Sequence, residues 1–287
     1  MKTLRALADL TRVFPNQLMI GAGVLIGEVV ALSGLPPLRQ AVLGFVGPAV
    51  LGASTFAMND YYDLESDRMG GRRDRPLVRG DISPRTARNV FLVGFPVGLV
   101  LSSIINLGCL VIAVVFALLA LAYNLRLKQT GLPGNLFIAS TMAIPFIYGS
   151  VAVGETPGLP VIVLSLMAFL SGTGREVLKD VMDVEADAVR ASRSIPRTMG
   201  LGFASRLSAG FFASAVALSP LPFFSRISAS FFLDPKYGVP VALTDLLLLY
   251  VMKRSLAITR PSDAVPLRGL SLAALGIGLL GFLFGSF

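Results

Sequence analysis

The stretch L-G-C-L-V-I-A-V-V-F-A-L-L-A-L-A at residues 107–122 contains no charged side chain. A helix needs roughly 20 predominantly apolar residues to cross the hydrocarbon core of a bilayer, and similar stretches recur on both sides of this one. Nine of them cover nearly the whole chain, with centres near residues 22, 50, 97, 115, 143, 168, 213, 245 and 276. The sequence therefore predicts an all-α, polytopic membrane protein with nine transmembrane helices and a single domain over residues 1–287.

The composition supports this class and limits the chemistry. Of the 287 residues, 54% are hydrophobic and 15% are charged, whereas soluble domains carry about 25% charged residues. The chain has no His, no Trp and one cysteine, Cys109. This excludes His-ligated haem, zinc sites built from Cys or His, disulfides and a His general base. Acid–base or metal chemistry must use carboxylates, which favour hard cations such as Mg²⁺.

Two features mark the helix boundaries. The third and fourth apolar stretches are separated only by a turn region at residues 102–108, and Pro220 and Pro222 interrupt the seventh. The amphipathic start of the chain carries Lys2, Arg5 and Arg12, and no cleavage site of the A-x-A type follows it. We interpret the apolar run after this start as the first membrane span.

Lysine and arginine divide unevenly between the two sets of loops that nine helices create. One set carries 22 of the 25: three at the N-terminus, seven between residues 68 and 88, two at 126 and 128, six between 175 and 206, and four between 253 and 268. By the positive-inside rule we expect a cytoplasmic N-terminus and an extracytoplasmic C-terminus in the cell membrane. The net charge of +8 indicates contact with membrane lipids, not with nucleic acid, and no obligate protein partner is evident.

The acidic residues cluster on the same side, which topology does not require. Of 17 Asp and Glu residues, six lie between residues 60 and 81 and five between residues 176 and 187. The first segment reads M-N-D-Y-Y-D-L-E-S-D-R and the second L-K-D-V-M-D-V-E-A-D-A, so that one Asp trio repeats the other at an offset of 120 residues. Glu65, Arg73, Pro76 and Gly80 recur at the same offset. The second and sixth helices are therefore predicted to be related elements that face each other across one cavity.

The spacing of each trio suits metal binding. Residues three and four apart share one helical face, so each trio forms a stripe of oxygen atoms, and six carboxylates are expected to converge. Carboxylates in contact repel one another unless a cation neutralises them, and two Mg²⁺ ions bridged by a diphosphate would do so. Arginines and lysines beside the acids could clamp phosphate oxygens. The alternatives are a set of solvated salt bridges and an EF-hand calcium site, but neither segment has the EF-hand spacing.

The two segments resemble signatures of a known family. N-D-Y-Y-D-L-E-S-D at 59–67 resembles the N-D-x-x-D-x-x-x-D motif of the UbiA superfamily of intramembrane prenyltransferases, and D-V-M-D-V-E-A-D at 180–187 resembles its second Asp motif. R-P-L-V-R-G at 75–80, Y-N-L-R-L-K at 123–128 and G-N at 134–135 are further matches. The resemblance implies a helix bundle around a central cavity, with two Mg²⁺ ions that bind an isoprenyl diphosphate.

The resemblance also implies roles for individual residues. Asn59, Asp63 and Asp67 would serve one metal ion, Asp183 and Asp187 the other, with Asp60 and Asp180 in support. Asp63, Asp67, Asp183 and Asp187, together with Tyr123 near the reacting carbon, would then be the catalytic set. The substrate-binding residues would be Arg12, Asn16, Arg68, Arg75, Asn124, Lys128, Arg175 and Lys179. For Tyr123 an interfacial anchor is an equal alternative, and for Asn16 a hydrogen bond between helices.

The acceptor is indicated by one further motif. R-E-V-L-K-D-V-M-D-V-E-A-D at 175–187 resembles the form found in archaeal digeranylgeranylglyceryl phosphate synthases, which transfer a geranylgeranyl group from geranylgeranyl diphosphate to geranylgeranylglyceryl phosphate, a lipid-phosphate acceptor. An aromatic acceptor such as 4-hydroxybenzoate, as in quinone biosynthesis, is the alternative. A transporter would instead place ionisable residues at mid-helix depth, where Glu28 is an exception among almost wholly apolar residues.

Overall fold

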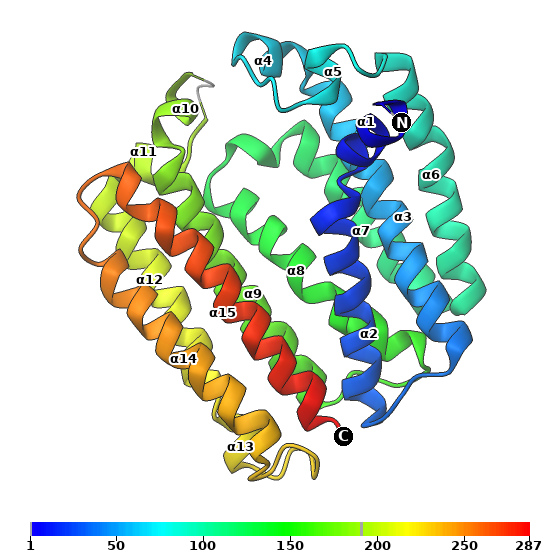
Figure 1. The fold of residues 1–287 in the computed structure, drawn as a ribbon, viewed down its shortest axis with the longest axis vertical. Helices are drawn as coiled ribbons and strands as arrows, with labels where there is room; N and C mark the ends of the chain where they lie inside the picture. Colours follow the sequence, from blue (N-terminus) through cyan, green and yellow to red (C-terminus); the bar gives the residue numbers. More distant parts are fainter. Residues whose placement is uncertain (1, 190–191) are drawn as a thin grey trace.

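The structure is a computed structural model that describes residues 2–189 and 192–287, and this part of the chain contains helices and connecting segments without strands. The long helices form one bundle (Figure 1). They are α2 (Leu18–Leu32), α3 (Leu38–Tyr62), α6 (Pro84–Ile105), α7 (Leu107–Leu125), α8 (Leu132–Ala152), α9 (Leu159–Met182), α12 (Leu201–Leu218), α14 (Pro235–Ser255) and α15 (Ala264–Gly285). The short ones are α1 (Lys2–Thr11), η1 (Val13–Gln17), α4 (Leu64–Met69), α5 (Pro76–Arg79), η2 (Leu127–Gln129), α10 (Val184–Val189), α11 (Ile195–Met199), α13 (Leu221–Phe224) and η3 (Pro261–Asp263).

The structure confirms a multi-pass membrane protein. Eight helical segments of the described chain are long and apolar enough to span a membrane. The predicted stretch centred near residue 245 corresponds to α14, which contains Lys236, Asp245, Lys253 and Arg254 and is not among the eight. This helix packs along α15 (Figure 1). That α14 also crosses the membrane stays a prediction.

The predicted helix boundaries are confirmed. Asn106 has an extended backbone between α6 and α7, and its side chain accepts a hydrogen bond from the Cys109 N–H at 2.8 Å, which caps α7. At the end of α12, residues 220–222 turn the chain into the four-residue helix α13. Proline at the start of α13 lacks the N–H that a continuing helix would need.

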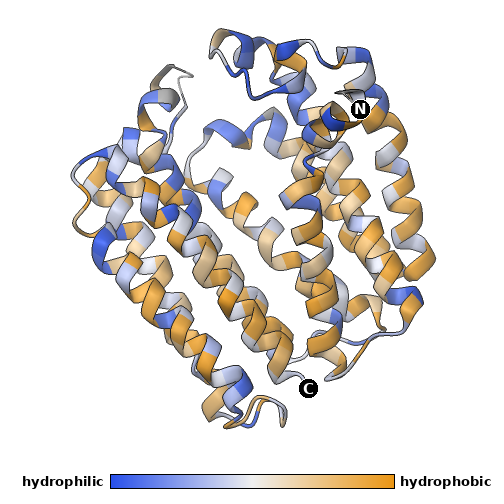
Figure 2. Cartoon of the chain, viewed as in Figure 1, coloured by the Kyte–Doolittle hydropathy of each residue, from blue (hydrophilic) through white to orange (hydrophobic). Residues whose placement is uncertain are grey.

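The polar segments gather at one end of the bundle. The N-terminus, α4, α5, α10 and α11 lie at that end, and the C-terminus lies at the opposite end (Figure 1). Figure 2 shows that hydrophilic residues concentrate in these short helices, whereas the long helices are mainly hydrophobic. Both Asp-rich segments therefore share one end of the molecule, as the sequence predicts.

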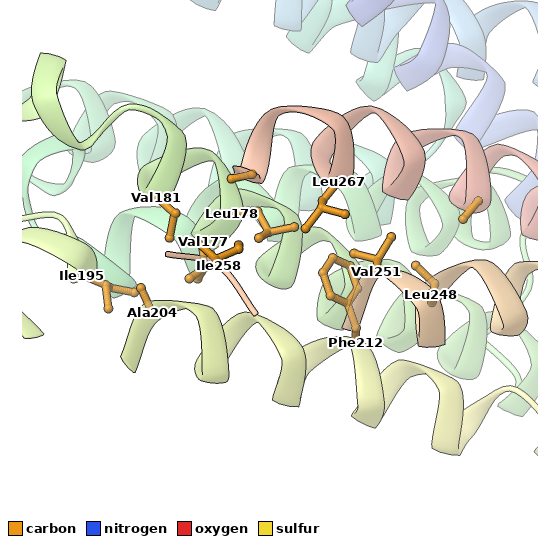
Figure 3. Close-up of a cluster of buried hydrophobic side chains, with 12 residues drawn as sticks. Val177, Leu178, Val181, Ile195, Ala204, Phe212, Leu248, Val251, Ile258 and Leu267 are labelled. Atoms are coloured by element: carbon orange, nitrogen blue, oxygen red, sulfur yellow. The ribbon is translucent and has the colours of Figure 1, made fainter. Parts of the chain in front are cut away.

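Small residues and interlocking side chains hold the bundle together. Val177, Leu178 and Val181 of α9 pack with Phe212 of α12 and Val251 of α14 in the largest buried cluster (Figure 3). Elsewhere, helix backbones touch directly. A Cβ atom on Gly149 of α8 would lie 2.1 Å from the carbonyl oxygen of Val24 in α2. Close backbone approach through small residues is how membrane helices associate where lipid removes the hydrophobic driving force.

Candidate active site

The 120-residue repeat is present in the backbone. Helices α3 and α9 end at equivalent positions, and the short helices α4 and α10 begin two residues after each end. The N–H of Asp63 donates to the carbonyl of Asn59, and that of Asp183 donates to the carbonyl of Lys179, both at 2.9 Å. In the same way, the N–H of Asp67 donates to the carbonyl of Asp63, and the N–H of Asp187 donates to the carbonyl of Asp183. Each trio thus keeps helical spacing across the break between two helices.

Two arginines bind Asp60, the first member of the first trio. Its Oδ1 accepts hydrogen bonds from Arg12 Nη2 at 2.7 Å and from Arg75 Nη1 at 3.1 Å, and the residue is 2% exposed. The Oδ2 atom is buried without a hydrogen-bond partner among the described residues. Arg75 also lies 3.6 Å from Oδ2 of Asp67. Arg12 can reach Asp60 because the chain kinks between α1 and η1, where Arg12 has φ 49°, and its guanidinium lies over the ring of Phe56 at 4.3 Å.

Lys128 contacts the next two polar residues of this stripe. It forms an ion pair with Asp63, and its Nζ lies 3.4 Å from Oδ1 of Asn59. Lys128 belongs to η2, in the connection between α7 and α8. The Y-N-L-R-L-K segment therefore reaches the first Asp segment, as its match to the family motif implies.

In the second segment a neutral side chain takes the place of the arginines. Asn135, near the start of α8, donates its Nδ2 to Oδ2 of Asp180 at 2.8 Å. Glu176 lies one turn before Asp180 on α9, is 6% exposed, and contacts Arg175 and Lys179 at 3.7 Å each. Both first Asp residues are thus buried and hydrogen-bonded, Asp60 by the arginines Arg12 and Arg75 and Asp180 by the neutral Asn135 of α8.

Arg72 is bound within the first loop. It donates two 2.9 Å hydrogen bonds to Asp74. These bonds raise the pKa of Arg72 and lower the pKa of Asp74. Tyr123, near the end of α7, is half-buried.

Tyr123 has an aromatic neighbour at this position. Its ring stacks on Phe137 of α8, with centroids 4.9 Å apart. The ring therefore packs against α8, and the site-lining role of Tyr123 stays a prediction.

The carboxylates do not converge as closely as expected. In the described part of the chain, no three carboxylate, Cys or His side chains are grouped tightly enough to hold one ion. Arg12, Arg75 and Lys128 instead form ion pairs with Asp60 and Asp63, and Asn135 donates a hydrogen bond to Asp180. Part of the negative charge of the first trio is therefore balanced by cationic side chains in this structure.

Some predicted site residues are not brought to these contacts. Arg68 lies on the exposed side of α4, where it pairs with Glu65 at 2.8 Å. Asn16 and Asn124 are half-buried, and within the described ranges neither side chain forms a hydrogen bond. The buried amide near Asn16 is that of Gln17, which donates to the Thr11 carbonyl at 2.8 Å.

Three residues of the site were missed as candidates. Asn135 contacts Asp180, Glu176 contacts Arg175, and Asp74 lies 3.8 Å from Arg75. Asn135 could have been identified from the family match at 134–135, and Glu176 from the R-E pair at 175–176. Asp74 gave no sequence signal, because its role depends on how the loop folds back toward Arg72.

Comparison with known proteins assigns the family. Residues 21–272 match the model of the UbiA prenyltransferase family. The chain belongs to the UbiA prenyltransferase family. It is 40% identical to the digeranylgeranylglyceryl phosphate synthase of Archaeoglobus fulgidus over 99% of this chain and 96% of that protein. It is 36% identical to the enzyme of that name from Methanopyrus kandleri, over 98% of both chains.

Solved structures of UbiA proteins share the fold. One that concerns digeranylgeranylglyceryl phosphate synthase in membranes has a TM-score of 0.83 and 30% identity, and covers 100% of this chain and 99% of its own. A UbiA homologue from Archaeoglobus fulgidus bound to DMAPP and Mg²⁺ has a TM-score of 0.66 at 18% identity, over 96% and 98% of the two chains. This confirms the all-α architecture of a UbiA membrane prenyltransferase.

Proposed function

We propose that this chain is a digeranylgeranylglyceryl phosphate synthase, which transfers a geranylgeranyl group from geranylgeranyl diphosphate to geranylgeranylglyceryl phosphate. The observation that carries the proposal is the 40% identity with a protein of that name over 99% of the chain. The R-E-x-x-K-D motif at 175–180 and the buried contacts of Glu176 and Asp180 support it. Both Asp segments lie at the same end of the bundle (Figure 1), as one site between them requires.

The side chains fit magnesium. Mg²⁺ binds through one or two carboxylates together with substrate phosphates and water, so a cluster of three carboxylates is not required. The donors available here are oxygen atoms, and the buried Oδ2 of Asp60 lacks a partner. We assign Asn59, Asp63 and Asp67 to one ion and Asp183 and Asp187 to a second, with Asp60 and Asp180 as supports. When bound, the two ions supply positive charge to the departing diphosphate.

The protein residues act on the diphosphate and on the allylic carbon. The bond between the first prenyl carbon and the diphosphate oxygen breaks, and the electron pair leaves with the diphosphate. Lys128, Arg75 and Lys179 stabilise that charge as it develops, which requires Lys128 to exchange its ion pair with Asp63 for a phosphate oxygen. Tyr123 and Phe137 face the allylic cation. The oxygen of the acceptor hydroxyl then attacks this carbon to form the ether bond, and its proton passes to the released diphosphate.

The membrane provides the environment for this reaction. The apolar helices exclude water, so the allylic cation survives until the acceptor captures it. Transfer of the prenyl chains from water into the apolar interior is favourable by about 0.8 kcal/mol for each CH₂ group. We assign the protein to the cell membrane with the acidic end in the cytoplasm, because the N-terminus and both Asp segments lie at that end and 22 of the 25 cationic residues fall in the same set of loops.

The test is a transfer assay with purified protein in lipid, Mg²⁺ and radiolabelled geranylgeranyl diphosphate. We expect a labelled diether phosphate with the wild type, and about a thousandfold lower kcat with Asp63→Ala, as for removal of a key electrostatic group. Glu65→Gln is the matched control, because Glu65 is exposed on α4 and pairs with Arg68. A product with 4-hydroxybenzoate alone would replace the lipid acceptor with an aromatic one. No product with either acceptor would overturn the proposal.

A further inference from the structure

Two arginines beside the second Asp segment have incomplete hydrogen bonding. Arg175 lies on α9, and Arg268 lies near the start of α15, which packs against α9. The Nε atom of each is buried and has no hydrogen-bond partner among the residues that the structure describes. The two guanidinium groups are also close enough for their positive charges to oppose each other.

The surrounding carboxylate does not balance this charge. Arg175 has a side chain that is 13% exposed, and its ion pair is a contact of 3.7 Å with Glu176. Lys179 shares the same carboxylate at 3.7 Å. Arg175 and Lys179 thus share one carboxylate, and within the described ranges Arg268 has no carboxylate as an ion-pair partner. A buried Nε–H group without a hydrogen bond is unfavourable, and a bound anion would remove both the unsatisfied donors and the repulsion.

The position of the pair relates it to the reaction centre. Arg175 precedes Asp180 by five residues on α9, which corresponds to about 7.5 Å along the helix axis. Since α9 ends at the polar end of the bundle (Figure 1), the pair lies on the membrane side of Asp180. Glu176 stands between the two on the chain. An anion on Arg175 and Arg268 would thus be separate from the diphosphate that Lys128 and Arg75 would hold.

We propose that Arg175 and Arg268 form the subsite for the phosphate group of the lipid acceptor. This inference rests on the proposed function, which requires an acceptor with its own phosphate. Two guanidinium groups from different helices can each donate two hydrogen bonds to one phosphate. Fixing the phosphate here holds the free hydroxyl of the glyceryl unit toward the allylic carbon near Tyr123. The arginine pair then selects phosphorylated over neutral acceptors.

The experiment compares geranylgeranylglyceryl phosphate with its dephosphorylated form, geranylgeranylglycerol, in wild type and Arg268→Gln. We expect the wild type to prefer the phosphorylated acceptor, and the preference in kcat/KM to fall by about tenfold to a hundredfold in the variant, as for a lost charge-assisted hydrogen bond. The KM for geranylgeranyl diphosphate should not change. Arg268→Lys should restore part of the preference. Arg254→Gln, at an exposed arginine of α14, should keep the wild-type ratio.

Each outcome decides the inference. Retained activity of Arg268→Gln on geranylgeranylglycerol would show that the variant folds, so that a lower preference reports the phosphate contact. An unchanged preference would overturn the subsite and leave the proposed function standing. An increase in the KM of the diphosphate instead would assign the pair to the donor. An effect that disappears when anionic lipids are replaced with neutral ones would assign it to lipid headgroups.

A separate measurement covers failure of the proposed function itself. If the wild type used neither acceptor, the subsite would be judged by thermal unfolding with millimolar glycerol phosphate. A larger increase in unfolding temperature for the wild type than for Arg268→Gln would support a phosphate site at this pair. Equal increases would overturn it.

Discussion

The pairing of Arg12 with Asp60 predicts a large effect from one substitution at the edge of the bundle. Arg12→Met removes the 2.7 Å hydrogen bond to a carboxylate that is 2% exposed. A hydrogen bond to a charged group contributes about 1.5–3 kcal/mol, and the contact with the Phe56 ring about 0.5–1 kcal/mol. Because Arg75 keeps its 3.1 Å bond to Asp60, the full penalty for an unpaired buried charge does not apply. We expect a loss of about 2–4 kcal/mol.

The assay is unfolding in mixed detergent micelles, followed by circular dichroism. Arg5→Met is the matched control, because Arg5 is exposed on α1, and surface changes of this kind usually stay within about 0.5 kcal/mol. Adding Asp60→Asn completes a double-mutant cycle, in which we expect a coupling energy of at least about 1 kcal/mol. A loss below about 0.5 kcal/mol for Arg12→Met, or strict additivity in the cycle, would refute the reasoning.

Three further changes have defined outcomes. Gly149→Ala should destabilise the bundle by about 2 kcal/mol or more, because the new Cβ atom would lie 2.1 Å from the backbone of α2. Gly210→Ala is the control: a Cβ atom there would have no neighbour within 4 Å, and the variant should be neutral in the same unfolding assay. Asp74→Asn should lower the free energy of unfolding by at most about 1 kcal/mol. Since Arg72 lowers the pKa of Asp74, this difference should stay constant from pH 8 to pH 5 and disappear only below 3.8, the ordinary pKa of an aspartate. A change in the difference between pH 6 and pH 8 would contradict the assignment. Lys128→Met should lower kcat by about a hundredfold or more, and a rise in acceptor KM alone would exclude its role in holding the diphosphate.

Much of the fold could be predicted because lipid restricts it to apolar helices. The run at residues 107–122 and the turn at Asn106 follow from hydropathy and capping, which are local properties. The membrane crossing of α14 is harder to predict, because Asp245 and the charges at its ends lower its hydropathy. Asp245 is accommodated by a 2.5 Å hydrogen bond from Ser219, a contact that depends on how α12 and α14 pack.

The candidate site was predictable where it depends on the repeat. The offset of 120 residues predicted that the two Asp segments are related and share one end of the molecule. The donors to the first Asp of each trio could not be derived in this way. Arg12 lies 48 residues from Asp60, and Asn135 lies 45 residues from Asp180. Such pairs depend on how far neighbouring helices are shifted relative to one another along their axes, which hydropathy does not encode.

The choice of a guanidinium on Asp60 and an amide on Asp180 makes the two halves of the duplicated unit electrically unequal. The carboxylate of Asp60 is bound by two arginines, whereas that of Asp180 accepts one hydrogen bond from a neutral amide. Neutralising the two carboxylates is therefore not equivalent. In the first half it would leave two arginines without their shared counter-ion, whereas the second half would lose only a hydrogen bond to an amide.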